Sequence, residues 1–205
     1  CALVCNHENQ CEGHCIRNRM PSHDPVHFSI IEDYISTTYA NKMTKGPAPK
    51  NGMKAAVVGA GPAGLTIAVL LARWGYDITI FDARDKIGGV MRYGIPNYRL
   101  PREVLDAEIA SMLALGIDVH VNVNVGDDVT FDELRQQNDA LYIALGAHTD
   151  KKTGIEGEDA EGVISAVEML REIGDDHMPD FRNKDIVVIG GGNVAMDVCR
   201  SAVRL

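Results

Sequence analysis

Two glycine-rich turns constrain the fold of this 205-residue chain more than any other feature of its sequence. The first is V-V-G-A-G-P-A-G at residues 57–64, and the second is V-V-I-G-G-G-N-V-A at residues 187–195. Each follows a short apolar run and opens a helix-forming segment, the order of a strand–turn–helix unit that binds a dinucleotide. Parallel strands are joined by crossover helices, so two such units predict an α/β fold of the Rossmann-like type.

The composition argues against two classes of partner. The formal net charge is -9, whereas binding to a nucleic-acid backbone needs a basic face. The sequence has no apolar run of about 18 residues, which is the length that a membrane span requires, and no secretory leader. We therefore expect a cytoplasmic protein that binds neither nucleic acid nor a membrane.

The chain is expected to comprise three parts, of which the last is incomplete. Residues 1–45 are rich in Cys and end in a helical pattern followed by a Pro- and Gly-containing linker; residues 46–180 and 181–205 each begin before a glycine turn. The second turn starts sixteen residues before the C-terminus, but a βαβ unit needs about 30 residues. Because the chain also starts at Cys1 rather than at Met, we expect a fragment.

Hydrophobic periodicity predicts helices and strands that alternate from residue 54 onward. We expect helices at residues 28–35, 63–74, 105–115, 131–137, 166–173 and from the second turn through 205, and strands at 55–58, 78–81, 119–125, 140–145 and 185–189. The strand at 119–125 should be half-buried and that at 140–145 buried.

The first glycine turn has the flanks that a dinucleotide site needs. Gly59 permits the tight turn, Gly61 permits approach of a diphosphate to helix N–H groups, and Gly64 permits close packing of helix on strand. Asp82 ends the next strand about 20 positions later, where its carboxylate can accept from ribose hydroxyls. These residues predict a dinucleotide site, against the alternative of a turn that only packs.

Residues after Asp82 favour FAD over NAD as the first dinucleotide. Arg84 and the pair Gly88-Gly89 let the backbone pass close to a cofactor, although an ordinary β-turn would also explain them. Residues 140–147, A-L-Y-I-A-L-G-A, are similar to the second flavin motif of flavoproteins with two dinucleotide domains, and a buried strand ending in glycine is the alternative. The combination is more specific than either part.

Residues 88–101, G-G-V-M-R-Y-G-I-P-N-Y-R-L-P, and 190–197, G-G-G-N-V-A-M-D, strongly resemble the small subunit of glutamate synthase and its relatives. Those include the large subunit of NADH-dependent ferredoxin:NADP oxidoreductase and the N-terminal half of dihydropyrimidine dehydrogenase. The resemblance runs through essentially the whole chain. It implies a two-dinucleotide-domain flavoprotein: a small helical iron–sulfur segment, then an FAD domain, then the start of an NAD(P)H domain.

The resemblance also implies which residues hold the two dinucleotides. The segment Tyr93-Gly94-Ile95-Pro96 would lie against the flavin ring, with a covering loop as the alternative. The expected cofactor residues are Gly59, Gly61, Pro62, Ala63, Gly64, Asp82, Ala83, Arg84, Gly88, Gly89, Tyr93, Gly94, Ile95, Pro96, Arg99, Val125, Ala144, Gly146 and Ala147 for FAD, and Gly190, Gly192, Asn193 and Ala195 for NAD(P)H. By the same resemblance, Asn193 and Asp197 would lie near the cofactor or the domain joint; a polar helix start and a surface carboxylate are the equal alternatives.

Four cysteines with the spacing C-x3-C-x5-C-x3-C are candidate thiolate ligands of a 4Fe–4S cluster: Cys1, Cys5, Cys11 and Cys15. In the resembled family, two clusters share ligands from this motif and from a further cysteine motif upstream. That implies Cys5 and Cys11 on one cluster and Cys15 on the other, with Glu32 as an additional ligand. We expect clusters in the parent protein but not in this piece; zinc bound with His7, His14 or His23, or idle thiols, are the alternatives.

The resemblance implies hydride transfer from NAD(P)H to FAD, and electron release through iron–sulfur clusters to a glutamate synthase large-subunit-like partner or a ferredoxin. No residue of the chain is expected to act as a catalytic acid, base or nucleophile. The alternative is a non-catalytic relay or docking subunit with a vestigial flavin site. A disulfide reductase is disfavoured, because no cysteine lies between Cys15 and Cys199.

Overall fold

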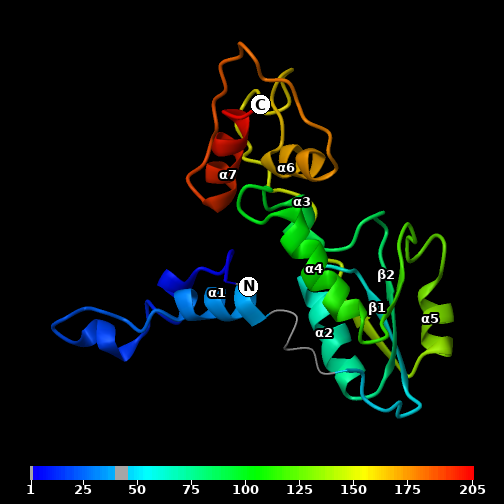
Figure 1. Cartoon of the computed structure of the whole chain (residues 1–205). Helices are drawn as coiled ribbons and strands as arrows, with labels where there is room; N and C mark the ends of the chain where they lie inside the picture. Colours follow the sequence, from blue (N-terminus) through cyan, green and yellow to red (C-terminus); the bar gives the residue numbers. More distant parts are fainter. Residues whose placement is uncertain (1, 40–45) are drawn as a thin grey trace. The chain divides into compact units, whose positions relative to one another are not determined.

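A computed structural model of the chain describes residues 2–39 and 46–205 (Figure 1). They fall into two compact units, Cys1–Lys45 and Gly46–Leu205. The further division expected at residue 180 stays a prediction.

The N-terminal unit contains two short 3-10 helices and one longer helix. These are η1 (His7–Asn9), η2 (Ile16–Arg19) and α1 (Phe28–Tyr39). The predicted helix at 28–35 is confirmed and continues for one more turn, whereas the two 3-10 helices were not predicted. No residue of α1 is buried. Polar contacts join the helix to the preceding loops: Ser29 N–H and Oγ–H donate to Glu12 Oε1, and Glu32 Oε2 lies 3.5 Å from Nε2 of the buried His7.

The second unit is built on a four-stranded parallel sheet in the order β3-β2-β1-β4. Its strands are β1 (Lys54–Val58), β2 (Asp77–Phe81), β3 (Asp118–His120) and β4 (Ala140–Ile143). Its helices are α2 (Pro62–Arg73), α3 (Val90–Tyr93), α4 (Arg102–Leu113), α5 (Phe131–Gln137), α6 (Ala166–Gly174) and α7 (Asn193–Ala202). The predicted α/β class with a parallel, Rossmann-like sheet is confirmed.

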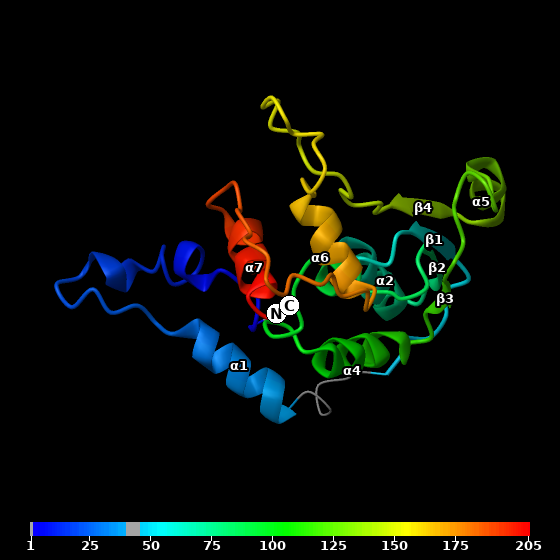
Figure 2. The ribbon, with the colours of Figure 1, turned by 90° about the horizontal axis from the view of Figure 1, so that it is seen from above.

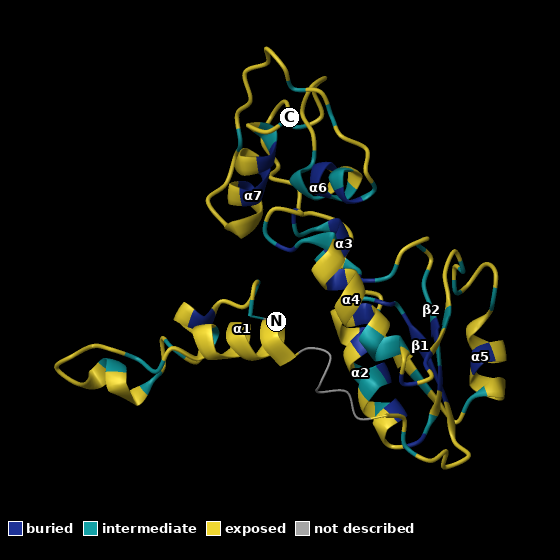
Figure 3. Ribbon diagram, in the orientation of Figure 1, coloured by how far each residue is buried: buried dark blue, intermediate teal, exposed yellow. Residues whose placement is uncertain are grey.

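Helices cover both faces of the sheet. Figures 1 and 2 show α2 and α4 on one face and α5 on the other. Side chains of β1 alternate between the faces: Ala56 and Val58 pack against Leu134 of α5, whereas Val57 faces Gly64 of α2. Because both faces are covered, the last four residues of β1 are buried, and they form the centre of the core seen in Figure 3.

Two predicted strands are shorter or more exposed than expected. The strand at 119–125 ends at His120, because Asn122 adopts φ +56° and its N–H donates to Arg84 O instead of continuing the ladder. The strand at 140–145 stops at Ile143, which is 57% exposed. Since β4 is the edge of the sheet among the described strands, the prediction that it is buried was wrong.

The predicted strand at 185–189 does not form. Val187 in that segment is 86% exposed, and within residues 46–205 no strand pairs with the segment. A strand gains its backbone hydrogen bonds only from a neighbour, so an apolar run alone is not sufficient. The helix that follows ends at Ala202 rather than at Leu205, and it packs on α6 through Val198, Met169 and Leu170.

The turn from β1 into α2 is the tightest approach of backbone to backbone in the sheet region. Gly59 adopts φ +106°, and a β-carbon on it would lie 2.3 Å from Ala144 O. A β-carbon on Gly64, in the first turn of α2, would lie 1.9 Å from Gly59 O. Only glycine therefore lets α2 start directly above the end of β1.

The carboxylate of Asp82, directly after β2, holds this turn. Its Oδ2 accepts from Ala60 N–H at 2.6 Å, and its Oδ1 accepts from Arg84 N–H at 2.9 Å. Gly88 N–H donates to Ala60 O at 2.9 Å and closes the loop from the other side. The turn conformation thus depends on hydrogen bonds from the segment that follows β2.

We expect Gly64→Ala to destabilise the unit by about 2–3 kcal/mol or more, because its methyl group must displace the Gly59 carbonyl. Chemical denaturation measures the change. Gly46→Ala is the matched control, since a β-carbon there has no neighbour within 4 Å. Equal stabilities of the two variants would contradict the close approach.

Asp82→Asn should cost about 1–3 kcal/mol, because an amide can accept from only one of the two N–H groups and turns its own NH2 toward the other. Asp139→Asn is the control: the Asp139 carboxylate accepts a backbone bond only from Lys54 N–H, which the amide oxygen can still accept. Thermal unfolding of both variants without cofactor would test this, and a loss in Asp139→Asn as large as that in Asp82→Asn would count against it.

Candidate functional site

The carboxyl ends of three neighbouring strands meet at the first glycine turn. Gly59 N–H donates to Phe81 O at the end of β2, and Ala144 N–H donates to Val58 O at the end of β1. The segments that begin at Gly59, Asp82 and Ala144 are therefore side by side. In parallel α/β sheets this edge is where ligands bind.

A cradle of bare backbone lies at the start of α2. Gly61 caps the helix, and no side chain occupies the cap. A β-carbon on Gly89 would lie 2.7 Å from Gly61 Cα, whereas a β-carbon on Gly61 would meet only Gly89 Cα, at 3.7 Å. The two glycines thus lie against each other and leave the mouth of the helix open. Backbone N–H groups and a helix dipole in such a place suit an anionic diphosphate.

Arg84 and Tyr93, both expected at FAD, contact each other. The Arg84 guanidinium carbon lies 4.4 Å from the centre of the Tyr93 ring, and Nη1 lies 3.4 Å from Asp175 Oδ2 of the loop after α6. Tyr93 is 7% exposed, and its hydroxyl donates to Lys86 O at 3.0 Å. Burial, with the neighbouring Asp85 carboxylate, raises the pKa of Tyr93 to about 12, so the hydroxyl remains a donor at neutral pH.

Most of the other residues expected at FAD lie in the turn after α3 or in the connection after β4. Gly94 and Ile95 form the turn after α3, with both N–H groups donating to Val90 O, and Pro96 is buried. Gly146, at φ +74°, follows β4 in the same connection as Ala144 and Ala147. Three further residues lie outside these two segments. Val125 packs against the core between β1 and α5, Ala83 is exposed, and Arg99 contacts α7.

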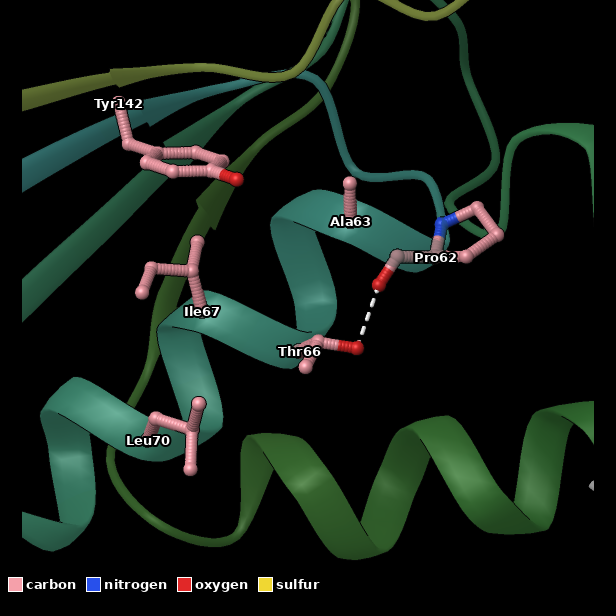
Figure 4. A pocket seen from close by; sticks show the side chains of 6 residues that line it. All are labelled: Pro62, Ala63, Thr66, Ile67, Leu70 and Tyr142. Atoms are coloured by element: carbon pink, nitrogen blue, oxygen red, sulfur yellow. Dashed lines mark hydrogen bonds between the residues drawn. The ribbon is translucent and has the colours of Figure 1, made fainter.

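A shallow apolar hollow of about 450 Å³ lies beside α2 (Figure 4). It is lined by Pro62, Ala63, Thr66, Ile67, Leu70 and Tyr142. The Thr66 hydroxyl donates back to Pro62 O at 2.7 Å, which leaves mainly carbon at the surface. Of these lining residues, only Pro62 and Ala63 were expected at a cofactor from the sequence. The spacing of residues 63, 66, 67 and 70 is the signal that one helix face would be shared.

The second glycine turn precedes α7 in the same way that the first precedes α2. Gly192 caps the helix without a side-chain hydrogen bond, and a β-carbon on Gly190 would lie 3.5 Å from the Ala195 β-carbon. Asn193 is the first residue of α7. Asp197, one turn later, is an acceptor for Arg99 and not a free surface carboxylate.

The expected iron–sulfur ligands are not gathered in the described part of the N-terminal unit. Cys1 lies outside the described residues. His7 separates two of the others: its Nδ1 lies 3.3 Å from Cys11 Sγ, and its Nε2 lies 3.5 Å from Glu32 Oε2. Among residues 2–39, no group of three or more Cys, His, Asp or Glu side chains could hold a metal ion, so Cys5, Cys11, Cys15 and Glu32 do not fit a cluster in this arrangement.

The zinc alternative meets the same obstacle. His14 Nδ1 lies 3.0 Å from Gln10 O, and His23 Nδ1 lies 2.8 Å from Asn18 O, so both rings contact backbone. Hydrogen bonds from the backbone, chiefly from Val26, lower the pKa of the Cys15 thiol.

Across the described ranges, no helix combines the length and the apolarity needed to cross a bilayer.

The chain is similar to known proteins over most of its length. Residues 53–205 match the family model described as pyridine nucleotide-disulphide oxidoreductase. The beta subunit of NADP(+)-dependent formate dehydrogenase from Moorella thermoacetica is 47% identical over 77% of this chain and 22% of its own length. The glutamate synthase NADPH small chain of Escherichia coli is 35% identical over 100% of this chain and 46% of its own length.

A solved structure has the same fold over most of the chain. FprA of Mycobacterium tuberculosis in complex with NADPH superposes with a TM-score of 0.63 and 27% identity, over 75% of this chain and 36% of that one. The chain thus spans less than half the length of these three proteins. The resemblance to glutamate synthase small subunits is confirmed, and the chain belongs to the pyridine nucleotide-disulphide oxidoreductase family.

Proposed function

We propose that this chain is the cofactor-binding part of a flavoprotein that oxidises NADPH by hydride transfer to FAD and delivers the electrons to a separate acceptor. The observation that carries the proposal is the bare cradle of Gly61 and Gly89 at the open mouth of α2, on the ligand-binding edge of a parallel sheet. A second helix with a glycine cap, α7, begins in the same unit.

FAD suits the first cradle by charge and by shape. Helix N–H groups at Ala63 and Gly64 would face the diphosphate, which a side chain on Gly61 would exclude. The Asp82 carboxylate accepts two backbone bonds, and a carboxylate has about four acceptor positions, so capacity remains for a ribose hydroxyl. The same residue would therefore set the loop and bind the nucleotide.

NADPH is proposed at the second turn, Gly190 to Asn193. Both curated relatives carry NADP or NADPH in their names, and FprA was solved with NADPH. When bound, the flavin supplies the redox chemistry: it takes up a hydride and can release electrons singly. The contribution of the chain is to bind and orient two dinucleotides, and we assign no catalytic side chain.

The acceptor is proposed to be a partner subunit. Two relatives are named as a subunit or chain of larger enzymes, a formate dehydrogenase and a glutamate synthase. No electron path through iron–sulfur clusters is derived from the N-terminal unit, because its described thiols do not meet. Iron–sulfur clusters in the parent protein, a ferredoxin acceptor and a cytoplasmic location all stay predictions.

The decisive experiment is anaerobic addition of NADPH to the full-length protein reconstituted with FAD. We expect the visible flavin absorbance to bleach, with NADPH more effective than NADH. A flavin that stays oxidised with both nucleotides would overturn the proposal and favour a relay subunit with a vestigial flavin site.

Gly61→Val should abolish FAD retention with little effect on folding. Gly61 has an extended backbone, φ -79°, and its β-carbon has only an ordinary contact, so the side chain would occupy the ligand space instead of the core. We expect at least about a tenfold loss of FAD affinity and a folding cost of about 1 kcal/mol.

FAD titration followed by flavin fluorescence measures this affinity, and Gly46→Val is the control. Undiminished affinity in the Gly61 variant would mean that the diphosphate lies elsewhere.

A further inference from the structure

The loop after α3 is joined to α7 by an ion pair and a hydrogen bond, although the two segments are almost a hundred residues apart in the sequence. Arg99 Nη1 donates to Asp197 Oδ2 at 2.6 Å, and the Tyr98 hydroxyl donates to the Asp197 backbone oxygen at 3.2 Å. The Arg204 guanidinium carbon lies 4.4 Å from the centre of the Tyr98 ring, which extends the contact to the end of the chain. The carboxylate and the backbone carbonyl of Asp197 are thus bound by two consecutive residues, Arg99 and Tyr98.

Burial makes this contact specific. The Asp197 side chain is 8% exposed and the Arg99 side chain 32%. A carboxylate so buried requires a charged partner, because an unpaired one would be costly to remove from water. Arg99 supplies that charge. Its guanidinium is therefore directed to α7 rather than presented free to a cofactor.

Each partner is connected to one of the two glycine turns through a helix. Asp197 lies one helical turn after Asn193, on the same face of α7, so fixing Asp197 fixes the start of the helix. Arg99 N–H donates to Pro96 O at 2.9 Å in a turn that follows α3. Helix α3 begins after Gly89, which abuts Gly61 of the first cradle.

We propose that Asp197 and Arg99 form a latch that sets the position of the second dinucleotide turn relative to the first. Asp197 is then a positioning residue, acting through Arg99, for the hydride transfer given under the proposed function, on which this inference rests. Hydride transfer requires the donor and acceptor rings to meet closely, and small misplacements of reacting groups reduce rates strongly. A buried ion pair between the segments that carry the two turns would keep the two dinucleotides in a fixed relative position.

Loss of the latch should loosen α7 without unfolding the unit. Val198 of α7 still packs on Met169 and Leu170 of α6. Helix α6 is itself anchored: a β-carbon on Gly174 would lie 2.7 Å from Tyr93 Cα, and Asp175 pairs with Arg84. The effects of latch variants can therefore be read in a folded protein.

The test uses Asp197→Asn, Arg99→Gln, the double variant and Arg99→Lys in the full-length protein. Hydrogen exchange is measured without nucleotide, and FAD content and the rate of flavin bleaching by NADPH are measured on the loaded protein. Asp159→Asn is the control, since Asp159 pairs with Lys152 at an exposed site outside both turns.

We expect faster exchange across α7 and bleaching slower by roughly tenfold or more in both single variants, with FAD content unchanged. The double variant should be no slower than the singles, because both remove one shared interaction. Arg99→Lys should recover part of the rate, and Asp159→Asn should match the unmodified protein.

Unchanged exchange of α7 in Asp197→Asn and Arg99→Gln would overturn the latch. A change of FAD content or flavin spectrum in Arg99→Gln alone, with Asp197→Asn normal, would also overturn it, because Arg99 would then act on the flavin directly. If the unmodified protein binds FAD but NADPH does not bleach it, the proposed function fails, and the exchange data still decide whether the latch exists.

Discussion

The close approach of α2 to β1 is the contact on which the rest of the second unit depends. It brings the helix mouth to the edge of the sheet, and it is feasible only because Gly59 and Gly64 carry no side chain. The cost of bending the chain so sharply is offset by the hydrogen bonds of Asp82 and Gly88 with Ala60. The same absence of side chains that permits packing also leaves backbone N–H groups accessible to a ligand.

A second constraint is electrostatic and joins distant parts of the chain. The segment between β2 and α4 supplies cations, and the carboxylates lie directly after α6 and on α7: Arg84 pairs with Asp175, directly after α6, and Arg99 pairs with Asp197 of α7. Both pairs are at least half-buried. These pairs attach α6 and α7, whose shared core is a few apolar side chains, to the segment between β2 and α4, beside the proposed flavin site. The chain as a whole is strongly acidic, yet these arginines are placed where they neutralise individual carboxylates.

Local sequence pattern was sufficient to predict an element whose backbone hydrogen bonds are formed within the element itself. The limits of α5 were predicted to the residue, and its N-terminus is fixed locally by a capping box between Thr130 and Glu133, three positions apart. Strands were predicted less well. The run at 185–189 is as apolar as β1 but has no neighbour among the described strands, and β4 is an edge. Burial of a strand is decided by what lies beside it, which no local window contains.

For the candidate site, the sequence by itself determined the two glycine turns, their helices and the carboxylate that follows β2, since these depend on residue types at fixed spacing. Tertiary structure decided how the charged side chains are used. Arg84, Tyr93 and Arg99 were all expected at a cofactor; in the structure Arg84 contacts Tyr93 and Asp175 after α6, and Arg99 contacts Asp197 of α7. It also decided that the described cysteines stay apart, with His7 between Cys11 and Glu32. Long side chains reach partners many residues away, and only the folded chain selects among them.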